Sequence, residues 1–532
     1  MTPFHQFRLW ARRAPIPERA AAGIGAALVV VVIAWLLTPA NQHSNRATGL
    51  VTNGSSAQVN GTTGTTLAGN TSAAVDSTIP QVGTGGGGAT AGRAPAAGAQ
   101  GPSSSQSSTG GGGPSGGSGG QGCVSPPGTD QGVTANQIKI AIVVVNIVGP
   151  AANQSFGLAS ATEQQQDYQQ VTDAINASGG VACRKLVPQF YTVNPVDQSN
   201  LQQTCLQIIQ AGVFMVIDYG GYFSSPALAN CYPQNHLPFF SSTLLPVQQR
   251  NQFYPYLFGT IGMVDVLYHN AIFALHDRGF FDAANGFQKL GIVYRDCVPE
   301  VFNEFTGWLG QVGVSSSQIV SYNMGCPSAF ASPSDIEQAI LKFQQSGVTH
   351  VTESLDQSDF ANFTTTAQQQ GFHPKYGLPQ DGIVATSYGS QHPDYTNIAG
   401  AIAIEPDTWG EERTPGYVPS AGTAKCNAIF QAQGRPPVYQ QPVGTGGTVC
   451  SQLWMFQAAV DHAPALQRSA LAAGLQAAKS FDTSYPVGPN DFTGPRATTG
   501  GEYWRVVQFL ANCNCWQVVD PTFHPSFPDA PA

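Results

Sequence analysis

The feature that most constrains the fold is an alternation of two hydrophobic periods after residue 137. Short apolar runs of strand length are separated by segments of helical spacing, such as Thr162 to Ala177, which ends at the helix stop Gly179-Gly180. Strands that alternate with helices predict βαβ units and a parallel sheet, in which covering helices leave the strands apolar throughout. The predicted strands are Ile138–Val145, Val213–Asp218, Leu290–Tyr294, Gln318–Tyr322, Val348–Thr352 and Ile383–Ala385.

The strand–helix rhythm starts again near Leu290, which indicates a second sheet. Leu257 to Met263 is where we expect the chain to leave the first sheet. The part of the chain after residue 122, about 400 residues, suits two lobes better than one core. We therefore expect an α/β fold of two doubly wound parallel-sheet lobes joined by a hinge. Lobe 1 should span about 132–260 and lobe 2 about 264–389, with parts of 390–532 added to both.

The N-terminal region carries a membrane signal. Residues 1–19 hold four arginines and one glutamate, and residues 20–38 are almost wholly apolar. About 20 apolar residues span a bilayer as a helix, and a basic flank stays in the cytoplasm. We expect a basic cytoplasmic tail and a transmembrane signal anchor; a signal peptide cleaved after Ala40 is the alternative. Both predict an extracytoplasmic folded domain, and the anchor makes it a single-pass protein of the cell membrane.

Residues 39–122 differ in composition from everything that follows. They are rich in Gly, Ser, Thr and Ala and contain only three charged residues. Such a segment cannot bury enough apolar surface to fold, so we expect a disordered tether with a reach of about 50 Å. The chain from residue 123 onward carries a net charge of −13, since 6 of the 22 basic and 2 of the 31 acidic residues precede it. This charge disfavours a nucleic-acid partner.

All ten cysteines lie in residues 123–532, and in an exported domain they are best interpreted as disulfides. Neighbouring cysteines predict the pairs Cys205–Cys231, Cys297–Cys326 and Cys426–Cys450. The other four cannot be paired from the sequence: Cys123, Cys183, Cys513 and Cys515. A Cys-x-Cys metal site at 513–515 is an alternative, but no His or second Cys pair lies near it, so we predict no metal site.

No motif supports an enzyme. Gly116–Gly120 matches the Gly-x-Ser-x-Gly nucleophile pattern and Gly83–Gly88 matches Gly-x-Gly-x-x-Gly, but both lie in the predicted tether. No P-loop motif is present, so ATP hydrolysis would need another subunit. We predict a protein without catalytic residues or cofactor.

The loops that follow the predicted strands are the candidate binding site. Ligands of open parallel sheets bind beyond the carboxyl ends of the strands, in front of helix N-termini. The loop Asn146 to Ser155 is in this position, and Asn146 and Gly149 are its candidate binding residues. Two lobes that face each other could enclose a small molecule between two such sets of loops.

Four stretches in order resemble the type I periplasmic-binding-protein family, in particular its leucine/isoleucine/valine- and amide-binding branch. They are GVTANQIKIAIVVVNIVGPAA (132–152), LPFFSSTLLP (237–246), TVCSQLWMFQAAVDHA (448–463) and the segment 487–519, in which FTGPRATTGGEYWRVVQF is the most specific piece. The resemblance implies a hinged two-lobe protein that closes on a solute.

The resemblance also implies candidate site residues. In the family, hydroxyl groups and backbone N–H groups of one lobe hold an amino-acid carboxylate. The matching positions here are Gly221, Tyr222, Ser224, Ser225, Ser241, Ser242 and Thr243. Ser224 or Ser225 could equally be a plain cap of the helix that opens at Pro226.

The second lobe departs from the family pattern, because no Tyr stands in the loop Arg295–Pro299. Its candidates are Asp356, which could neutralise an ammonium or be a solvated loop residue, and Ser387 and Tyr388. An amide, a small peptide or a polyol therefore remains open beside an amino acid. The resemblance implies the solute-binding protein of an ABC importer, with permease subunits as partners. A membrane-tethered sensor or receptor without a transport role is the alternative.

Overall fold

The computed structural model describes residues 125–526 except 223–224, 243–245, 296–298, 326–329, 380–381, 384–385, 387–391, 409, 441–445 and 485. The chain divides into two units, Met1–Gly112 and Gly113–Ala532, and the described residues all belong to the second. The predicted tail, anchor and tether lie outside the described residues. From residue 125 to 526, the described part contains no helix with the length and hydropathy needed to cross a membrane.

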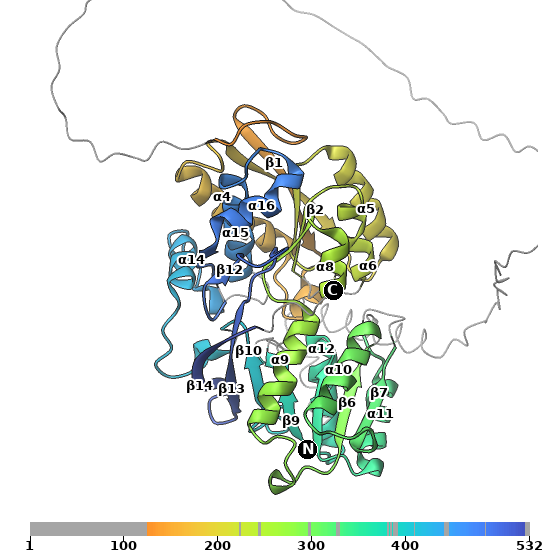
Figure 1. The fold of residues 1–532 in the computed structure, drawn as a ribbon. Coiled ribbons are helices and arrows are strands. Elements are labelled where there is room, and N and C mark those ends of the chain that lie inside the picture. The colour runs from red at the N-terminus through yellow and green to blue at the C-terminus, as the bar shows by residue number, and fades with distance from the viewer. Residues whose placement is uncertain are drawn as a thin grey trace, which may run out of the picture. The chain divides into compact units, whose positions relative to one another are not determined.

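Lobe 1, in which β1 and β2 are labelled in Figure 1, is built on a five-stranded parallel sheet of order β2-β1-β3-β4-β5. Its strands are β1 (Gln137–Val145), β2 (Lys185–Val193), β3 (Met215–Asp218), β4 (Phe239–Ser241) and β5 (Leu257–Gly259). Its helices are α3 (Pro150–Ser155), α4 (Ala161–Ala177), α5 (Gln198–Ala211), α6 (Pro226–Ala229), α7 (Cys231–Gln234) and α8 (Val247–Phe253). Strand β1 is buried from Ile140 to Val145, as its unbroken apolar sequence predicts.

Lobe 2 is built on a seven-stranded sheet of order β14-β13-β10-β9-β8-β6-β7. The parallel strands are β6 (Leu290–Tyr294), β7 (Ile319–Asn323), β8 (His350–Ser354), β9 (Lys375–Leu378) and β10 (Ile402–Glu405). The hairpin of β13 (Tyr503–Leu510) and β14 (Cys515–Pro525) extends this sheet in the antiparallel direction. The helices are α9 (Val264–Asp277), α10 (Pro299–Gln311), α11 (Pro333–Ser346) and α12 (Gln357–Gln369).

The remaining elements connect and cover the lobes. Helices α14 (Ala421–Gln431) and α15 (Gly447–Asp461) contact α4 of lobe 1, and α16 (Leu471–Ala478) packs on α15. A small sheet joins β11 (Ser480–Phe481) to β12 (Asn490–Asp491). The 3-10 helices are η1 (Ala283–Asn285), η2 (Ser316–Gln318), η3 (Glu411–Arg413), η4 (Val438–Gln440) and η5 (Arg468–Ala470). The chain thus passes between the lobes after β5, after β10 and before β13.

Most sequence predictions of regular structure are confirmed, and one is wrong. The predicted strands starting at Ile138, Val213, Leu290, Gln318 and Val348 overlap β1, β3, β6, β7 and β8, and the predicted helix 162–177 is α4. Ile383 lies in a helical turn and is not in the next strand, and residues 384 and 385 lie outside the described residues. That strand is β9, eight residues earlier, where Gly377 lets Leu275 of α9 approach the backbone closely.

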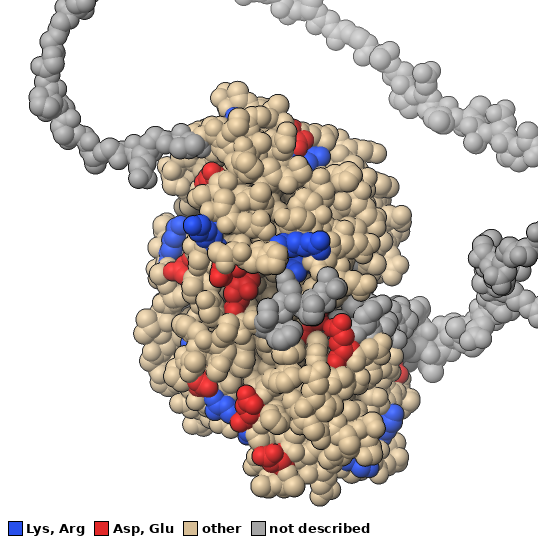
Figure 2. Space-filling model, viewed as in Figure 1, with Lys and Arg blue, Asp and Glu red and all other residues tan. Residues whose placement is uncertain are grey.

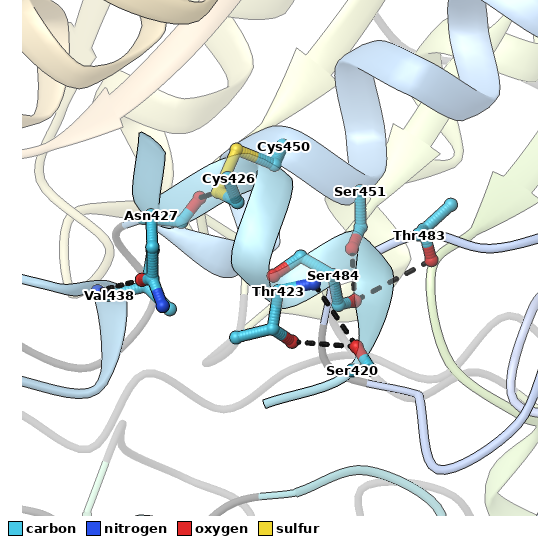
Figure 3. The surroundings of a disulfide bond; sticks show 10 residues. Ser420, Thr423, Cys426, Asn427, Val438, Cys450, Ser451, Thr483 and Ser484 are labelled. Carbon is cyan, nitrogen blue, oxygen red and sulfur yellow. Dashed lines mark hydrogen bonds between the residues drawn. A yellow bond between two sulfur atoms is a disulfide. The ribbon is translucent and has the colours of Figure 1, made fainter. Parts of the chain in front are cut away.

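Two of the predicted disulfides are confirmed in the described residues. Cys205–Cys231 joins α5 to α7, and Cys426–Cys450 joins α14 to α15 (Figure 3). Cys297 and Cys326 lie outside the described residues. Cys183 is also disulfide-bonded. Cys513 and Cys515 form a disulfide at the turn between β13 and β14, which corrects the alternative of a metal site there.

The surroundings of the Cys426–Cys450 disulfide show how this part of lobe 1 is held together. Ser420 caps α14 by accepting the Thr423 N–H at 3.1 Å (Figure 3). Ser451 of α15 donates to the carbonyl oxygen of Ser484 at 2.5 Å, which ties the chain before β12 to the same helix pair. One disulfide and these hydrogen bonds therefore hold two helices and a connecting segment in one cluster.

Candidate functional site

The carboxyl end of β3 carries a buried acid, Asp218. Its side chain is fully buried, and its Oδ1 atom accepts the N–H groups of Gly220 at 3.1 Å and Gly221 at 2.7 Å. The Ser242 hydroxyl, one strand along, donates to Oδ2 at 3.4 Å. Burial raises the pKa of Asp218 to about 6, although these hydrogen bonds act in the opposite direction. Asp218 therefore organises the loops that follow both β3 and β4.

The loop after β1 is closed on itself by two asparagines. Asn146 accepts the N–H of Gly149 at 2.8 Å, and Gly149 opens α3 with a φ of 105°. Asn153 is fully buried and accepts the Ile147 N–H at 2.8 Å while its amide donates to the Val145 carbonyl at 2.8 Å. Asn146 and Gly149 are thus at the end of β1 as predicted, with these polar groups engaged within the loop.

The carboxyl ends of the lobe 2 strands meet around Arg295, which follows β6. Its side chain is 8% exposed, and its Nε–H donates to the Gly325 carbonyl beyond β7 at 3.2 Å. One of its terminal nitrogens lies 3.4 Å from Asp356 and 3.5 Å from Asp359. Arg295 therefore connects the loops after β6, β7 and β8.

The two aspartates beside Arg295 differ in environment. Asp356 is the N-cap of α12 and accepts the N–H groups of Ser358 at 2.9 Å and of Asp359 at 3.0 Å. Asp359 is fully buried and accepts the Ala331 N–H at 2.9 Å. Burial and the nearby Asp356 carboxylate raise the pKa of Asp359 to about 8, against the pull of Arg295. A further buried acid, Glu353 of β8, accepts the Leu355 N–H at 2.6 Å.

An aromatic contact joins the strand-end loops of the two lobes. Phe156, which ends α3 in lobe 1, stacks on Phe330 of the lobe 2 loop before α11. The ring centroids are 4.7 Å apart and the rings are nearly parallel, at 10°. Both rings are partly buried and belong to loops that follow the carboxyl ends of strands, β1 and β7. The two sets of strand-end loops are therefore in direct contact at this point.

The described residues form no acidic group fit for a metal ion, and the face in Figure 2 shows no single basic surface. Within residues 125–526, as far as they are described, no group of three or more His, Cys, Asp or Glu side chains is placed to hold a metal ion. On the face in Figure 2, Lys and Arg side chains are scattered in small groups rather than gathered in one basic surface. The candidate site is thus a set of polar loops with more acids than bases.

Comparison with known proteins identifies the family. A family model described as periplasmic binding protein matches residues 137–513. The chain belongs to the periplasmic binding protein family. No curated protein sequence gives a significant match.

The solved structures similar to this periplasmic binding protein include ABC transporter solute-binding proteins. One, from Rhodopseudomonas palustris in complex with 4-hydroxybenzoate, has a TM-score of 0.54 and 14% identity, covering 74% of this chain and 98% of that one. A fatty acid ABC transporter substrate-binding protein from Thermomonospora curvata has a TM-score of 0.53 and 14% identity, covering 76% and 97%. A Desulfitobacterium hafniense protein in complex with Leu has a TM-score of 0.51 and 15% identity, covering 72% and 100%. Identities this low show a shared fold.

The predicted site residues of this periplasmic binding protein fall into three groups. Asn146, Gly149, Gly221, Ser242 and Asp356 lie at strand ends, as described above. Ser224, Thr243, Ser387 and Tyr388 lie outside the described residues. Ser225 is the N-cap of α6 without a side-chain cap hydrogen bond, and Ser241 is buried within β4.

Tyr222 requires a correction. The aromatic residue in the loop after β3 was expected to contact a solute, but its side chain is 1% exposed. Its ring packs edge-on against those of Tyr232 and Phe239 in the lobe 1 core, and its hydroxyl is 2.5 Å from that of Tyr232. The ring adds to the apolar cluster of lobe 1, and the Tyr232 hydroxyl satisfies its buried O–H.

Five residues of the strand-end region were not predicted: Asp218, Arg295, Asp359 and the stacked pair Phe156 and Phe330. Asp218 was visible as the acid that ends the apolar run Val213–Asp218, and a charge in that position signals the end of a buried strand. The ion pairs of Arg295 join residues 61 and 64 positions apart, and no local pattern indicates such contacts.

Proposed function

We propose that this periplasmic binding protein is an extracytoplasmic solute-binding protein of an ABC importer. The single observation that carries the proposal is that polar strand-end loops of two sheets meet, through Phe156 and Phe330, in a chain of this family. The fold relatives named above are ABC transporter proteins, which supports permease subunits as partners. A small polar solute held between the two strand-end regions fits the uncharged and acidic groups found there.

We further propose that residues 20–38 anchor the protein in the membrane and that residues 39–122 tether the binding domain outside the cell. The support is the basic N-terminal flank and the uncharged apolar run that follows it. Protease added to intact cells should then degrade the domain and leave a small cell-associated N-terminal fragment. A chain that stays intact until the cells are lysed would contradict the proposed location.

Solute binding is tested by thermal denaturation of the purified full-length chain with a panel of small solutes. The panel contains leucine, 4-hydroxybenzoate and octanoate, each beside its primary amide. A solute present at a hundred times its dissociation constant should raise the free energy of unfolding by about 2.7 kcal/mol. A panel without any shift would contradict the proposed function.

A further inference from the structure

The hydrogen bonds around Asp218 determine which chemical groups the described residues after β3 and β4 can offer to a solute. Backbone N–H groups at strand ends and helix starts are the usual donors for an anionic ligand. After β3 those of Gly220 and Gly221 are already taken by the Asp218 carboxylate, at 3.1 and 2.7 Å. The protein's own carboxylate therefore fills this pair of donors.

The same carboxylate sets the direction of the Ser242 hydrogen bond. An ionised carboxylate only accepts hydrogen bonds, so Ser242 must donate its single hydroxyl proton to Oδ2 of Asp218. Ser242 is half-buried, whereas Asp218 is fully buried beneath it. What remains of the Ser242 hydroxyl for a solute is its oxygen lone pairs.

The described charges do not compensate Asp218. Among the ion pairs of the described residues, none includes Asp218. In lobe 2, the guanidinium of Arg295 already lies beside Asp356 and Asp359. A solute carboxylate placed on Ser242 would face a nearby negative charge and a hydroxyl without a proton to give, whereas a donor group would be favoured by both.

We propose that Ser242 accepts a hydrogen bond from the solute, so that the solute group in contact with Ser242 is a donor such as a primary amide, hydroxyl or ammonium, and not a carboxylate. This inference rests on the proposed function and names its solute class. Asp218 acts through Ser242 as a positioning residue. The hydrogen-bonded pair of Asp218, which ends β3, and Ser242, which follows β4, therefore favours an uncharged or cationic solute group.

The test is calorimetric titration of the full-length chain with matched acid and amide pairs in which neither compound has another donor group: octanoate and octanamide, benzoate and benzamide. In at least one pair the amide should bind about tenfold or more tightly than its acid. An acid that binds as well as its amide, or better, overturns this inference and leaves the proposed function standing. If no compound of the panel binds, the proposed function fails and the inference fails with it.

The variant Asp218→Asn tests the mechanism. The Asn oxygen can still accept from Gly220 and Gly221, but its amide now donates to Ser242, which frees the hydroxyl proton for the solute. The preference for the amide should fall by about tenfold or more. Asp277→Asn, an exposed acid of α9, is the matched control and should keep the wild-type ratio. An unchanged ratio in folded Asp218→Asn overturns the proposal.

A second variant keeps the test decisive if Asp218→Asn does not fold. Ser242→Ala removes the acceptor and should weaken binding of the amide about tenfold while leaving the acid nearly unchanged. Equal losses for the two compounds, or no loss for the amide, would overturn the assignment of Ser242 as an acceptor.

Discussion

Phe156 of lobe 1 and Phe330 of lobe 2 stack with their ring centroids 4.7 Å apart. Because the two residues are far apart in sequence and belong to different sheets, their contact reports on the approach of the strand-end loops. The approach of the two lobes can therefore be tested by measuring the strength of this contact, without a solute.

A double-mutant cycle measures this contact. Phe156→Ala and Phe330→Ala should show a coupling free energy of about 1 kcal/mol in unfolding, the usual size for an aromatic pair. The double variant should also bind solute more weakly, because one contact between the lobes is lost. The stacked pair Trp504 and His524, within the β13–β14 hairpin, is the control and should leave solute affinity unchanged. Additive effects of the two phenylalanine variants would show that the rings do not interact in solution.

The two glycines Gly422 and Gly307 should respond oppositely to substitution by alanine, although both lie in helices. A Cβ atom on Gly422 would meet the carbonyl oxygen of Thr483 at 1.8 Å, whereas one on Gly307 of α10 meets nothing within 4 Å. Gly422→Ala should lower the free energy of unfolding by about 2 to 3 kcal/mol, since α14 must move away. Gly307→Ala should raise it by about 0.5 to 1 kcal/mol through helix propensity. Urea denaturation measures both, and equal effects would contradict the packing of α14 on Thr483.

The two disulfides of the C-terminal part should differ in how much they stabilise the protein, because they close loops of different length. Cys426–Cys450 spans 24 residues and Cys513–Cys515 spans 2. In the chain-entropy model, replacing both cysteines by serine should cost about 3 kcal/mol for the first pair and about 1 to 2 kcal/mol for the second. Denaturant unfolding of the two double-serine variants gives the comparison. A larger loss from the 513–515 pair would contradict this ordering.

Buried aspartates should make the protein less stable as the pH rises from 4 towards 7. Asp265 accepts the Val247 N–H at 3.0 Å and joins α9 to α8, and burial raises its pKa to about 6 from an ordinary value of 3.8. Between these two values the folded state binds more protons than the unfolded state, so the free energy of unfolding decreases as pH rises. Asp218 acts in the same direction over the same range.

Asp265→Asn isolates this effect. The neutral side chain can still accept the Val247 N–H. Between pH 4 and pH 6.5, the free energy of unfolding should fall by up to about 3 kcal/mol less in the variant than in the wild type. Thermal unfolding across this range gives the two profiles. Parallel profiles for the variant and the wild type would show that Asp265 titrates normally in the folded state.

The sequence predicts the fold well where burial is complete and local. The unbroken apolar run of β1 and the capped, periodic α4 both match their predictions, because their patterns depend on the element itself. The strand assigned to Ile383–Ala385 was wrong because a short apolar triplet cannot distinguish a strand from a buried helical turn. That parts of residues 390–532 join each lobe was expected, but which elements join which lobe depends on long-range packing, and no periodicity reveals it.

The candidate site was less predictable than the fold. Strand ends were located correctly, and Asn146, Gly149, Gly221, Ser242 and Asp356 lie at them; contact of these residues with a solute stays a prediction. The sequence could not show that Tyr222 turns into the core or that Asp218 takes the Gly220 and Gly221 N–H groups. Both facts depend on where the side chains point, and the spacing of residues in a loop does not indicate that direction.

The central claim is that one solute is held by residues of both lobes. It is tested most directly by calorimetry on the full-length chain and its variants, with the solute of the panel that binds most tightly. One solute should bind per chain. The affinity should be about tenfold or more weaker in Ser242→Ala of lobe 1 and in Asp356→Asn of lobe 2, whose Asn can still cap α12. Asp197→Asn, an exposed cap of α5, should bind as the wild type does. Wild-type affinity in either site variant would contradict a solute held by both lobes.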